Sequence, residues 1–326
     1  MITSSLFDDV LIQPVQQGAD RLLVVSGYAS SAMVSFHFDR VREKKKELSV
    51  KLIVGMCGRD GLPVSYHRGF QKLALEDYPQ NFECSYIYRS APVHSKVYIW
   101  LKDEEPFASF AGSANYTQIA FGSKQREVLA PCDPHQSLAY FKSLEPDSIF
   151  CSDPDAETEI RIYSDPQYFK RPKEAIDAGE GLQTMPEYIE TPSFPCVRVS
   201  LLDRYGDLPQ RSGLNWGQRP EEGREPNQAY ISLKADVYRT DFFPPRKARF
   251  TVITDDGKAL ICTRAQDNGK AIHTPQNNSQ IGEYFRNRLG VASGARITKK
   301  HLADYGRFDL VFCKLDDETY SMDFSV

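Results

Sequence analysis

The chain has 326 residues, of which 41% are hydrophobic and 26% are charged, and its formal net charge is −4. This length is enough for two domains with separate cores, and the near-neutral charge argues against a generic basic coat, so that any contact with nucleic acid must be local. No apolar run reaches the roughly 18 residues of a membrane span, and the N-terminus lacks the pattern of a secretory signal, which predicts a cytoplasmic protein with no membrane contact.

The seven cysteines are scattered, and no C-x-x-C pair occurs. An odd, dispersed set of this kind is typical of reduced, buried thiols in a cytoplasmic protein. We therefore expect neither a disulfide framework nor a zinc site.

Residues 1–150 alternate between apolar strand patterns and helical patterns. The sequence predicts helices within 30–47, 65–78 and 134–147, and strands within 20–30, 48–57, 82–90, 94–102, 106–115 and 126–132. Alternation of this kind indicates an α/β domain with a mixed sheet and flanking helices. His37 and His67 fall within predicted helices, and we expect both to be structural residues.

The composition changes twice after residue 150. Residues 151–193 are rich in proline and hold 4 Lys/Arg against 10 Asp/Glu, which indicates an acidic linker with little structure of its own. Residues 194–326 hold 20 Lys/Arg against 17 Asp/Glu. This last region predicts a mostly-β domain, a small or open barrel, with strands within 196–202, 228–234, 248–265 and 308–324, turns at 254–258 and 314–320, and one helix at 280–289.

A group of polar residues in the first region suggests chemistry. His94 and Lys96 are two residues apart in a predicted strand, so both side chains face the same way. Like charges repel, and this pairing is favourable when an anion lies between the two groups. Gly112, Ser113 and Asn115 end the next predicted strand and Glu127 follows, so neighbouring strands would bring these side chains into one pocket.

Phosphoryl transfer suits such a pocket. An imidazole can attack phosphorus and form a covalent intermediate, while Lys96 and Asn115 can donate to the non-bridging oxygens. Glu127 could hydrogen-bond the far nitrogen of a histidine and fix its tautomer. The sequence supplies no carboxylate cluster for magnesium, so we expect a mechanism that needs neither metal nor cofactor.

The H-S-K and G-S-A-N motifs with a later glutamate resemble the catalytic motif of the phospholipase D superfamily. The resemblance implies that His94, Lys96, Ser113, Asn115 and Glu127 are the catalytic residues. One position departs from the pattern, because Leu101 stands where the superfamily usually has an aspartate, which weakens a lipid-hydrolase interpretation more than a nuclease interpretation. The superfamily site needs two copies of the motif and this chain has one, which implies a homodimer with the site at its two-fold axis.

Two polar loops in the last region carry side chains that can read base edges. The first offers Arg211, Asn215, Trp216, Gln218, Arg219 and Arg224. The second offers Gln266, Asp267, Asn268, Lys270, His273, Asn277 and Asn278. By composition alone these could equally be two solvated loops.

The order of strands, the LNWGQR loop and the segment from FTVITDDGK to IGEYFRNRLG resemble a B3-like DNA-binding pseudobarrel. In such a domain the arms that read the major groove would correspond to residues 211–228 and 264–280. A phospholipase D-like nuclease joined to this domain resembles the NgoFVII-type restriction endonucleases over nearly the whole chain. The resemblance implies sequence-specific cleavage of double-stranded DNA. It also allows a cognate methyltransferase and a separate ATP-dependent translocase as partners. This chain has no G-x-x-x-x-G-K-[ST] loop, so we do not expect it to hydrolyse ATP itself.

Two other functions stay open at this point. A phosphodiesterase acting on phospholipid would be favoured by two motif copies and a membrane-facing helix, and the sequence shows neither. A DNA-binding module with an inactive or partner-gated nuclease is the other alternative, and the intact set of His94, Lys96, Asn115 and Glu127 argues against an inactive one.

Overall fold

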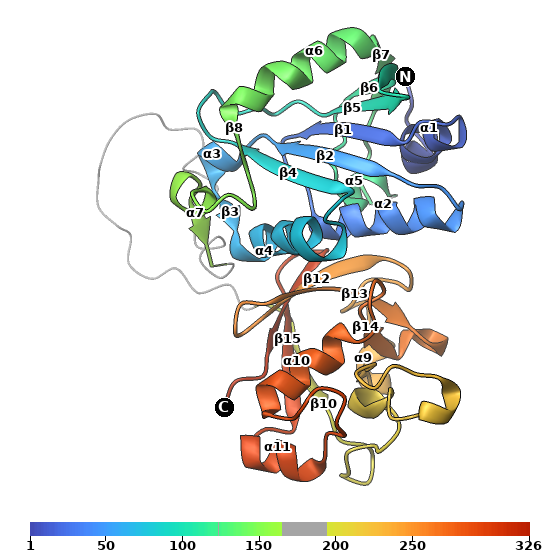
Figure 1. The fold of residues 1–326 in the computed structure, drawn as a ribbon, viewed down its shortest axis with the longest axis vertical. Helices are drawn as coiled ribbons and strands as arrows, with labels where there is room; N and C mark the ends of the chain where they lie inside the picture. The colour runs from blue at the N-terminus through green and yellow to red at the C-terminus, as the bar shows by residue number, and fades with distance from the viewer. Residues whose placement is uncertain (123, 165–193) are drawn as a thin grey trace.

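The computed structural model describes residues 1–122, 124–164 and 194–326, which form two seven-stranded sheets and one two-stranded pair (Figure 1). The first sheet is mixed, with strand order β7-β6-β5-β1-β2-β4-β8. β1, β2 and β4 are parallel to one another, whereas β5 runs antiparallel to β1. Its strands are β1 (Arg21–Ser26), β2 (Ser49–Val54), β4 (Phe82–Ile87), β5 (Val97–Lys102), β6 (Glu105–Gly112), β7 (Leu129–Cys132) and β8 (Ser148–Phe150).

Helices cover both faces of this sheet, which explains why β1 and β2 are almost uninterrupted apolar runs. α6 lies on one face, and α2 and α4 lie on the other, between the sheet and the second domain (Figure 1). α2 begins after Ser30, whose hydroxyl accepts a bond from the backbone N–H of Met33. The helices are α1 (Gln13–Gln16), α2 (Ser31–Glu43), α3 (Cys57–Asp60), α4 (Val64–Lys72), α5 (Gln118–Phe121), α6 (Pro134–Leu144) and α7 (Ala156–Glu159).

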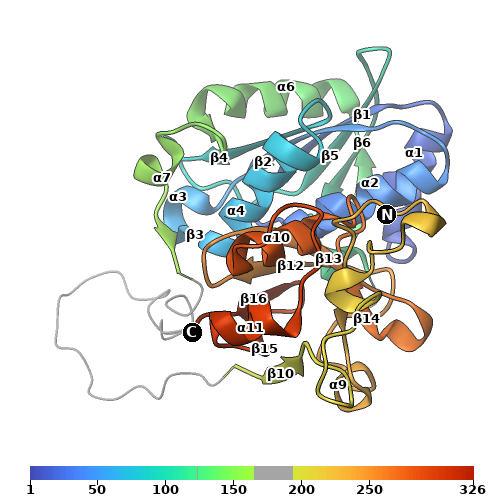
Figure 2. The same cartoon turned by 60° about the horizontal axis from the view of Figure 1, so that its bottom comes forward.

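The second sheet is mostly antiparallel and curls around an aromatic core that includes Phe243, Phe250, Phe312 and Tyr320. Its strand order is β10-β15-β16-β12-β13-β14-β11. Its strands are β10 (Cys196–Ser200), β11 (Ile231–Ser232), β12 (Arg249–Thr254), β13 (Ala259–Ala265), β14 (Ala271–His273), β15 (Asp309–Lys314) and β16 (Thr319–Asp323). The helices around it are α9 (Ala235–Tyr238), α10 (Gln280–Leu289) and α11 (Lys299–Tyr305), and Figure 2 shows α10 and α11 on one side of the sheet.

The predicted α/β domain and mostly-β domain are both confirmed, and the helix at 280–289 has the predicted bounds. The turns at 254–258 and 314–320 join antiparallel strands, as expected. Within the expected linker, α7 and a short strand, β9 (Ile162–Tyr163), are ordered, and β9 pairs with β3 (Leu62–Pro63). The rest of that segment, 165–193, lies outside the described residues, and the domain boundaries stay a prediction.

The expectation about the cysteines is wrong in two respects. Cys196 and Cys313 are bonded to each other, because the antiparallel pairing of β10 with β15 places them directly opposite one another. Cys132 is a free thiol but is exposed, at the end of the edge strand β7. The other free cysteines are buried, as predicted: Cys57, Cys84, Cys151 and Cys262.

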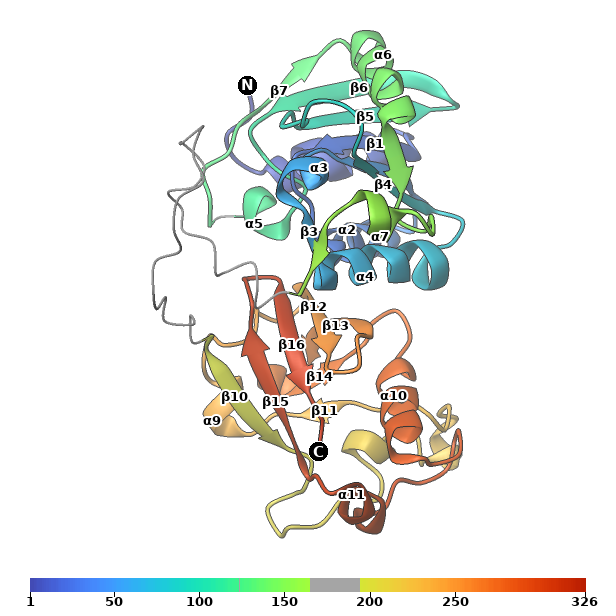
Figure 3. The same ribbon diagram turned by 90° about the vertical axis from the view of Figure 1, so that its left-hand side faces the viewer.

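The two domains share an interface in which β12 and β13 pack against α2 and α4 (Figure 3). Ile261 of β13 belongs to the hydrophobic core of the first domain. At the centre, the hydroxyls of Ser31 and Thr251 are 2.8 Å apart, and Arg249 pairs with Asp39 of α2. Gly69 of α4 lies so near that a Cβ there would be 2.3 Å from the Ser31 hydroxyl.

None of the helices within the described ranges is long and apolar enough to cross a membrane.

The Arg249–Asp39 pair predicts how firmly the interface is held. Its side chains are only 11% and 17% exposed, so an Arg249→Met variant leaves the mostly buried Asp39 carboxylate with only its longer contact to Arg42, at 3.6 Å, and should lower the stability by about 2 kcal/mol. The control is Lys300→Met, whose partner Asp304 is 60% exposed and whose loss should cost less than about 0.5 kcal/mol. Thermal unfolding of both variants checks this, and equal midpoints for the two would contradict it.

Candidate active site

His94 and Lys96 lie in the extended segment that leads into β5, at the edge of the first sheet where β1 and β2 end. The antiparallel pairing of β5 with β1 explains this position, because it places the start of β5 beside the end of β1. β6 pairs with β5 and ends at the same edge, where Gly112 N–H donates to the carbonyl of Lys96 at 3.1 Å. The predicted neighbouring strands therefore do bring the two motifs together.

Two glycines permit a very close approach of backbone at this edge. Val93 N–H donates to the carbonyl of Gly55 at 2.9 Å, and a Cβ on Gly55 would lie 2.0 Å from the carbonyl oxygen of Val93. A Cβ on Gly112 would lie 2.0 Å from the carbonyl oxygen of Val128. Any other residue at Gly55 would push the segment carrying His94 and Lys96 away from the sheet, and any other residue at Gly112 would push the segment that leads into β7 away from the end of β6.

The side chains of His94 and Lys96 face each other, as their spacing predicts. The Lys96 ammonium is 3.3 Å from Nε2 of His94 and donates to the His94 carbonyl at 2.6 Å. Lys96 is only 6% exposed, whereas His94 is exposed. Burial lowers the pKa of Lys96, and the negative charge of Glu127 partly offsets that effect.

Asn115 is fixed by the end of β1. Its amide oxygen accepts from the Tyr28 backbone N–H at 3.2 Å and from the Ser26 hydroxyl at 3.4 Å. These bonds occupy the oxygen, so the group that Asn115 can offer to an anion is its amide nitrogen, a donor.

Ser113 and Glu127 are bonded to each other. The Ser113 hydroxyl donates to the Glu127 carboxylate and accepts from the Val128 N–H at 3.0 Å. Within the described part of a single chain, Glu127 has no hydrogen bond to His94, so the expected role in fixing a histidine tautomer stays a prediction. The observed contact instead ties β6 to β7 beside Lys96.

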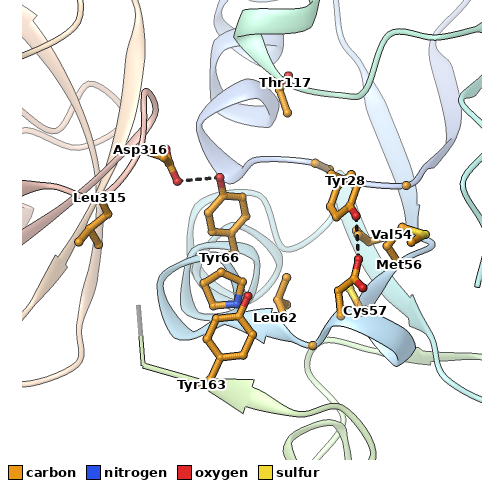
Figure 4. A pocket seen from close by; sticks show the side chains of 15 residues that line it. Tyr28, Val54, Met56, Cys57, Leu62, Tyr66, Thr117, Tyr163, Leu315 and Asp316 are labelled. Atoms are coloured by element: carbon orange, nitrogen blue, oxygen red, sulfur yellow. Dashed lines mark hydrogen bonds between the residues drawn. The ribbon is translucent and has the colours of Figure 1, made fainter. Parts of the chain in front are cut away.

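The structure adds Tyr28, which the sequence did not single out. Its ring packs edge-on against His94 with ring centroids 6.0 Å apart, and its hydroxyl donates to Asp60 at 2.7 Å. Tyr28 also borders a hollow of about 280 Å³ between the domains (Figure 4). The nearest sequence signal was the small-residue segment SGYAS at the end of the first predicted strand, which gave no reason to choose the tyrosine.

His37 and His67, which were expected to be structural residues, are fully buried. Nδ1 of His37 contacts the Tyr116 hydroxyl at 2.8 Å, and its Nε2 contacts the Leu11 carbonyl at 3.0 Å. Burial lowers the pKa of His37 to about 4, so this ring is neutral and structural.

A turn of the second domain reaches the segment that follows Asn115. The Glu318 carboxylate, 5% exposed, accepts from the Ile119 backbone N–H at 3.2 Å and from the Gln118 amide at 3.1 Å. Gln118 also donates to the carbonyl of Arg249 at 2.9 Å and accepts from its N–H at 3.0 Å. Burial raises the pKa of Glu318, and these donors oppose that shift.

The first predicted DNA arm is only partly available for contact. Asn215 was expected to be able to contact bases, but its side chain is fully buried. Its amide nitrogen donates to the carbonyls of Pro209 at 2.9 Å and Ile297 at 2.8 Å. The Gln218 amide nitrogen is likewise used by the carbonyls of Pro226 and Gly294.

The arginines of this arm are nearer the surface and are paired with acids of the same loop. Arg211 pairs with Glu221. The Glu222 carboxylate pairs with the guanidinium of Arg219 at 3.0 Å and with that of Arg224 at 2.8 Å. The Arg224 guanidinium also stacks 4.0 Å from the Trp216 ring. These ion pairs hold the arginines against acids of their own loop.

The second arm presents its tip to solvent. The exposed residues are Gln266, Asp267, Asn268, Lys270 and Asn277. His273 and Asn278 bond to each other instead, with Nδ1 of His273 2.8 Å from the Asn278 oxygen. Burial lowers the pKa of His273, so that ring is neutral near pH 7.

The second arm and the edge that carries His94 lie on opposite sides of the molecule. In Figure 1, α3, which follows the end of β2, is at the left, whereas β14 and the loop before it are at the right. Within the described chain, no three His, Cys, Asp or Glu side chains cluster in a way that could hold a metal ion.

Comparison with known proteins identifies both halves. Residues 4–158 match the model of the NgoFVII restriction endonuclease N-terminal PLD domain, and residues 190–316 match that of the NgoFVII C-terminal B3-like DNA-binding domain. A search of curated proteins gave no match.

Two solved structures are similar to the first half. NucT from Helicobacter pylori is 17% identical with a TM-score of 0.32, and the match covers 46% of this chain and 96% of NucT. Polyphosphate kinase from Porphyromonas gingivalis is 15% identical with a TM-score of 0.29, and the match covers 48% of this chain and 24% of the kinase. The family models span both domains, and the chain belongs to the NgoFVII restriction endonuclease family, with its phospholipase D-type nuclease domain and its B3-like DNA-binding domain.

Proposed function

We propose that the protein is a homodimeric, sequence-specific DNA endonuclease that cuts phosphodiester bonds through a covalent phosphohistidine. The observation that carries this proposal is the contact between His94 and Lys96, 3.3 Å apart at an exposed sheet edge with the Asn115 amide held nearby by β1. This arrangement combines a nucleophile with two donors of different charge, which is what the non-bridging oxygens of a phosphodiester require.

The reaction proceeds in two displacements. An imidazole nitrogen of one His94 attacks phosphorus, the bond to the leaving ester oxygen breaks, and the partner subunit's His94 gives that oxygen a proton. Water then attacks the phosphohistidine, loses a proton to the partner subunit's His94, and releases the phosphate end with the first imidazole restored. Because each chain carries one H-x-K motif, the two histidines must come from two chains related by a two-fold axis.

Charge stabilisation in this scheme comes from the protein itself. Lys96 supplies a positive charge that is mostly shielded from water, and a charge in such surroundings acts more strongly on a developing negative charge. The reaction therefore needs no metal ion, and the first domain serves as the site of dimerisation.

The second domain selects the sequence through the exposed tip of the second arm and the arginines of the first. Double-stranded DNA is the partner that the B3-like domain implies. A cognate methyltransferase and an ATP-dependent translocase are further candidates in the same system.

The central role of His94 predicts metal-independent cleavage. Purified protein should convert long phage DNA to discrete fragments in EDTA, and His94→Ala should lower the rate by at least about 10⁴-fold because the nucleophile is lost. Agarose gels of matched reactions check this result. Equal cleavage by both proteins would refute the assignment, and cleavage that needs magnesium would refute the metal-independent mechanism.

The lowered pKa of Lys96 predicts the alkaline side of the pH profile. A lysine with a depressed pKa loses its proton at a lower pH than the ordinary value of 10.5, so the cleavage rate should fall as the pH rises toward that value. Lys96→Arg keeps its charge throughout this range and should be slower at neutral pH but flat on the alkaline side. Single-turnover rates between about pH 7 and 10 measure this difference. The same alkaline fall in Lys96→Arg would show that another group is responsible.

The exposed and the buried asparagine of the two arms predict different effects of substitution, one on DNA binding and the other on stability. Asn268→Ala removes an exposed side chain that can bond a base, and should weaken binding to the preferred sequence by roughly 5- to 150-fold. Asn215→Ala removes buried hydrogen bonds, and should lower the stability by about 1–3 kcal/mol without changing the preferred sequence. Selection of bound duplexes from a random pool, together with thermal unfolding, separates the two outcomes. A changed preference in Asn215→Ala alone would contradict the structure.

A further inference from the structure

The C-terminal end of α2 carries a cluster of basic side chains that no step above uses. Arg42, Lys44, Lys45 and Lys46 are exposed, and within the described ranges the ammonium groups of the three lysines have no hydrogen-bonded or ion-paired partner. Lysines are strongly hydrated and repel one another, so a run of three without acidic partners is costly unless an anion neutralises it.

The acids around this cluster are mostly engaged elsewhere. Glu43 is bonded to Arg40 at 2.5 Å, and Asp39 pairs with Arg249 of the second domain and, at 3.6 Å, with Arg42 of the cluster, so neither acid contacts the three lysines. Glu47 is the acid of this segment whose carboxylate has no hydrogen bond or ion pair within the described residues. The segment therefore presents an excess of positive charge to solvent.

The basic segment adjoins the second DNA arm. Arg42 donates to the amide oxygen of Gln276 at 3.0 Å, and the Gln276 nitrogen donates to the Asp77 carbonyl at 3.4 Å. Gln280, just beyond the arm, donates to the Asp77 carboxylate at 3.0 Å. These bonds fix the end of the arm against the nuclease domain, directly beside the lysines.

The figures place both features at the same end of the molecule. In Figure 1, the C-terminal end of α2 and the β13–β14 loop both lie at the right, opposite α3. Figure 2 also has α2 and β14 on its right-hand side. The cluster therefore belongs to the recognition end rather than to the catalytic edge.

The surface is hollowed at the cluster. A depression of about 440 Å³ is bordered by Arg42, Lys45, Lys46, Tyr78 and Asn81, with Glu47 as its one carboxylate. Two ammonium groups, a guanidinium and an amide in one hollow match the non-bridging oxygens of a phosphate group.

We propose that residues 42–46 of the nuclease domain bind the phosphate backbone of DNA that flanks the sequence held by the arms. This inference rests on the proposed function, in which the second domain binds double-stranded DNA. The contact carries no base information, so it adds affinity and fixes the direction of the duplex across both domains without altering the preferred sequence.

The test compares two pairs of substitutions in the full chain, both in the His94→Ala background so that no DNA is cut. Lys45→Gln with Lys46→Gln removes two charges from the hollow. Lys142→Gln with Lys258→Gln removes the same charge from exposed positions on α6 and the β12–β13 turn. Binding of a 30-base-pair duplex of arbitrary sequence is measured by fluorescence anisotropy at several NaCl concentrations.

The proposal expects the first variant to bind about tenfold more weakly at low salt, and the slope of log K against log salt to flatten by about 1–2. The control should match the parent in affinity and slope. Equal behaviour of the two variants would overturn the phosphate contact. No measurable binding by the parent would instead count against the proposed function, which keeps the two failures distinct.

Discussion

The candidate site depends on how closely the backbone can approach itself at one edge of the first sheet. A Cβ on Gly55 would lie 2.0 Å from the Val93 carbonyl oxygen, so only glycine lets the segment before β5 lie against the end of β2. A Cβ on Gly112 would lie 2.0 Å from the Val128 carbonyl oxygen, so only glycine lets the end of β6 lie against the start of β7. The first approach brings His94 and Lys96 to the end of β1, which in turn holds Asn115 through Ser26 and the Tyr28 backbone. The catalytic group is thus set by main-chain packing as much as by its own side chains.

The second domain is packed firmly against the first domain. Glu318 places a buried carboxylate on the backbone of Ile119, four residues after Asn115, and a buried carboxylate is stable only when donors satisfy it. Arg249 and Asp39 close the interface at α2, the helix whose far end lies beside the second arm. The side of the molecule that carries the second arm and the edge that carries His94 are consequently joined through α2 and the turn at 314–320.

Much of this could be predicted from sequence because it depends on local spacing. The two-residue spacing of His94 and Lys96 and the G-S-A-N segment after the next strand could both be recognised in the sequence, and the structure brings them together at one edge. The features that the sequence did not predict depend on contacts between residues that are distant in sequence. Asn215 is buried because Ile297 takes its amide, Cys196 meets Cys313 through strand pairing, and Tyr28 reaches His94 through the fold of the edge. The catalytic roles themselves stay predictions.

The central claim is that two chains build one site, and mixed dimers test it most directly. Wild-type protein is exchanged with increasing amounts of His94→Ala protein, and the initial rate of DNA cleavage is measured at constant total protein. If each site needs a histidine from both chains, an equal mixture should keep roughly a quarter of the wild-type rate, and the rate should follow the square of the wild-type fraction. A rate that falls in direct proportion to the wild-type fraction, to about half in the equal mixture, would show that one chain suffices and would contradict the account.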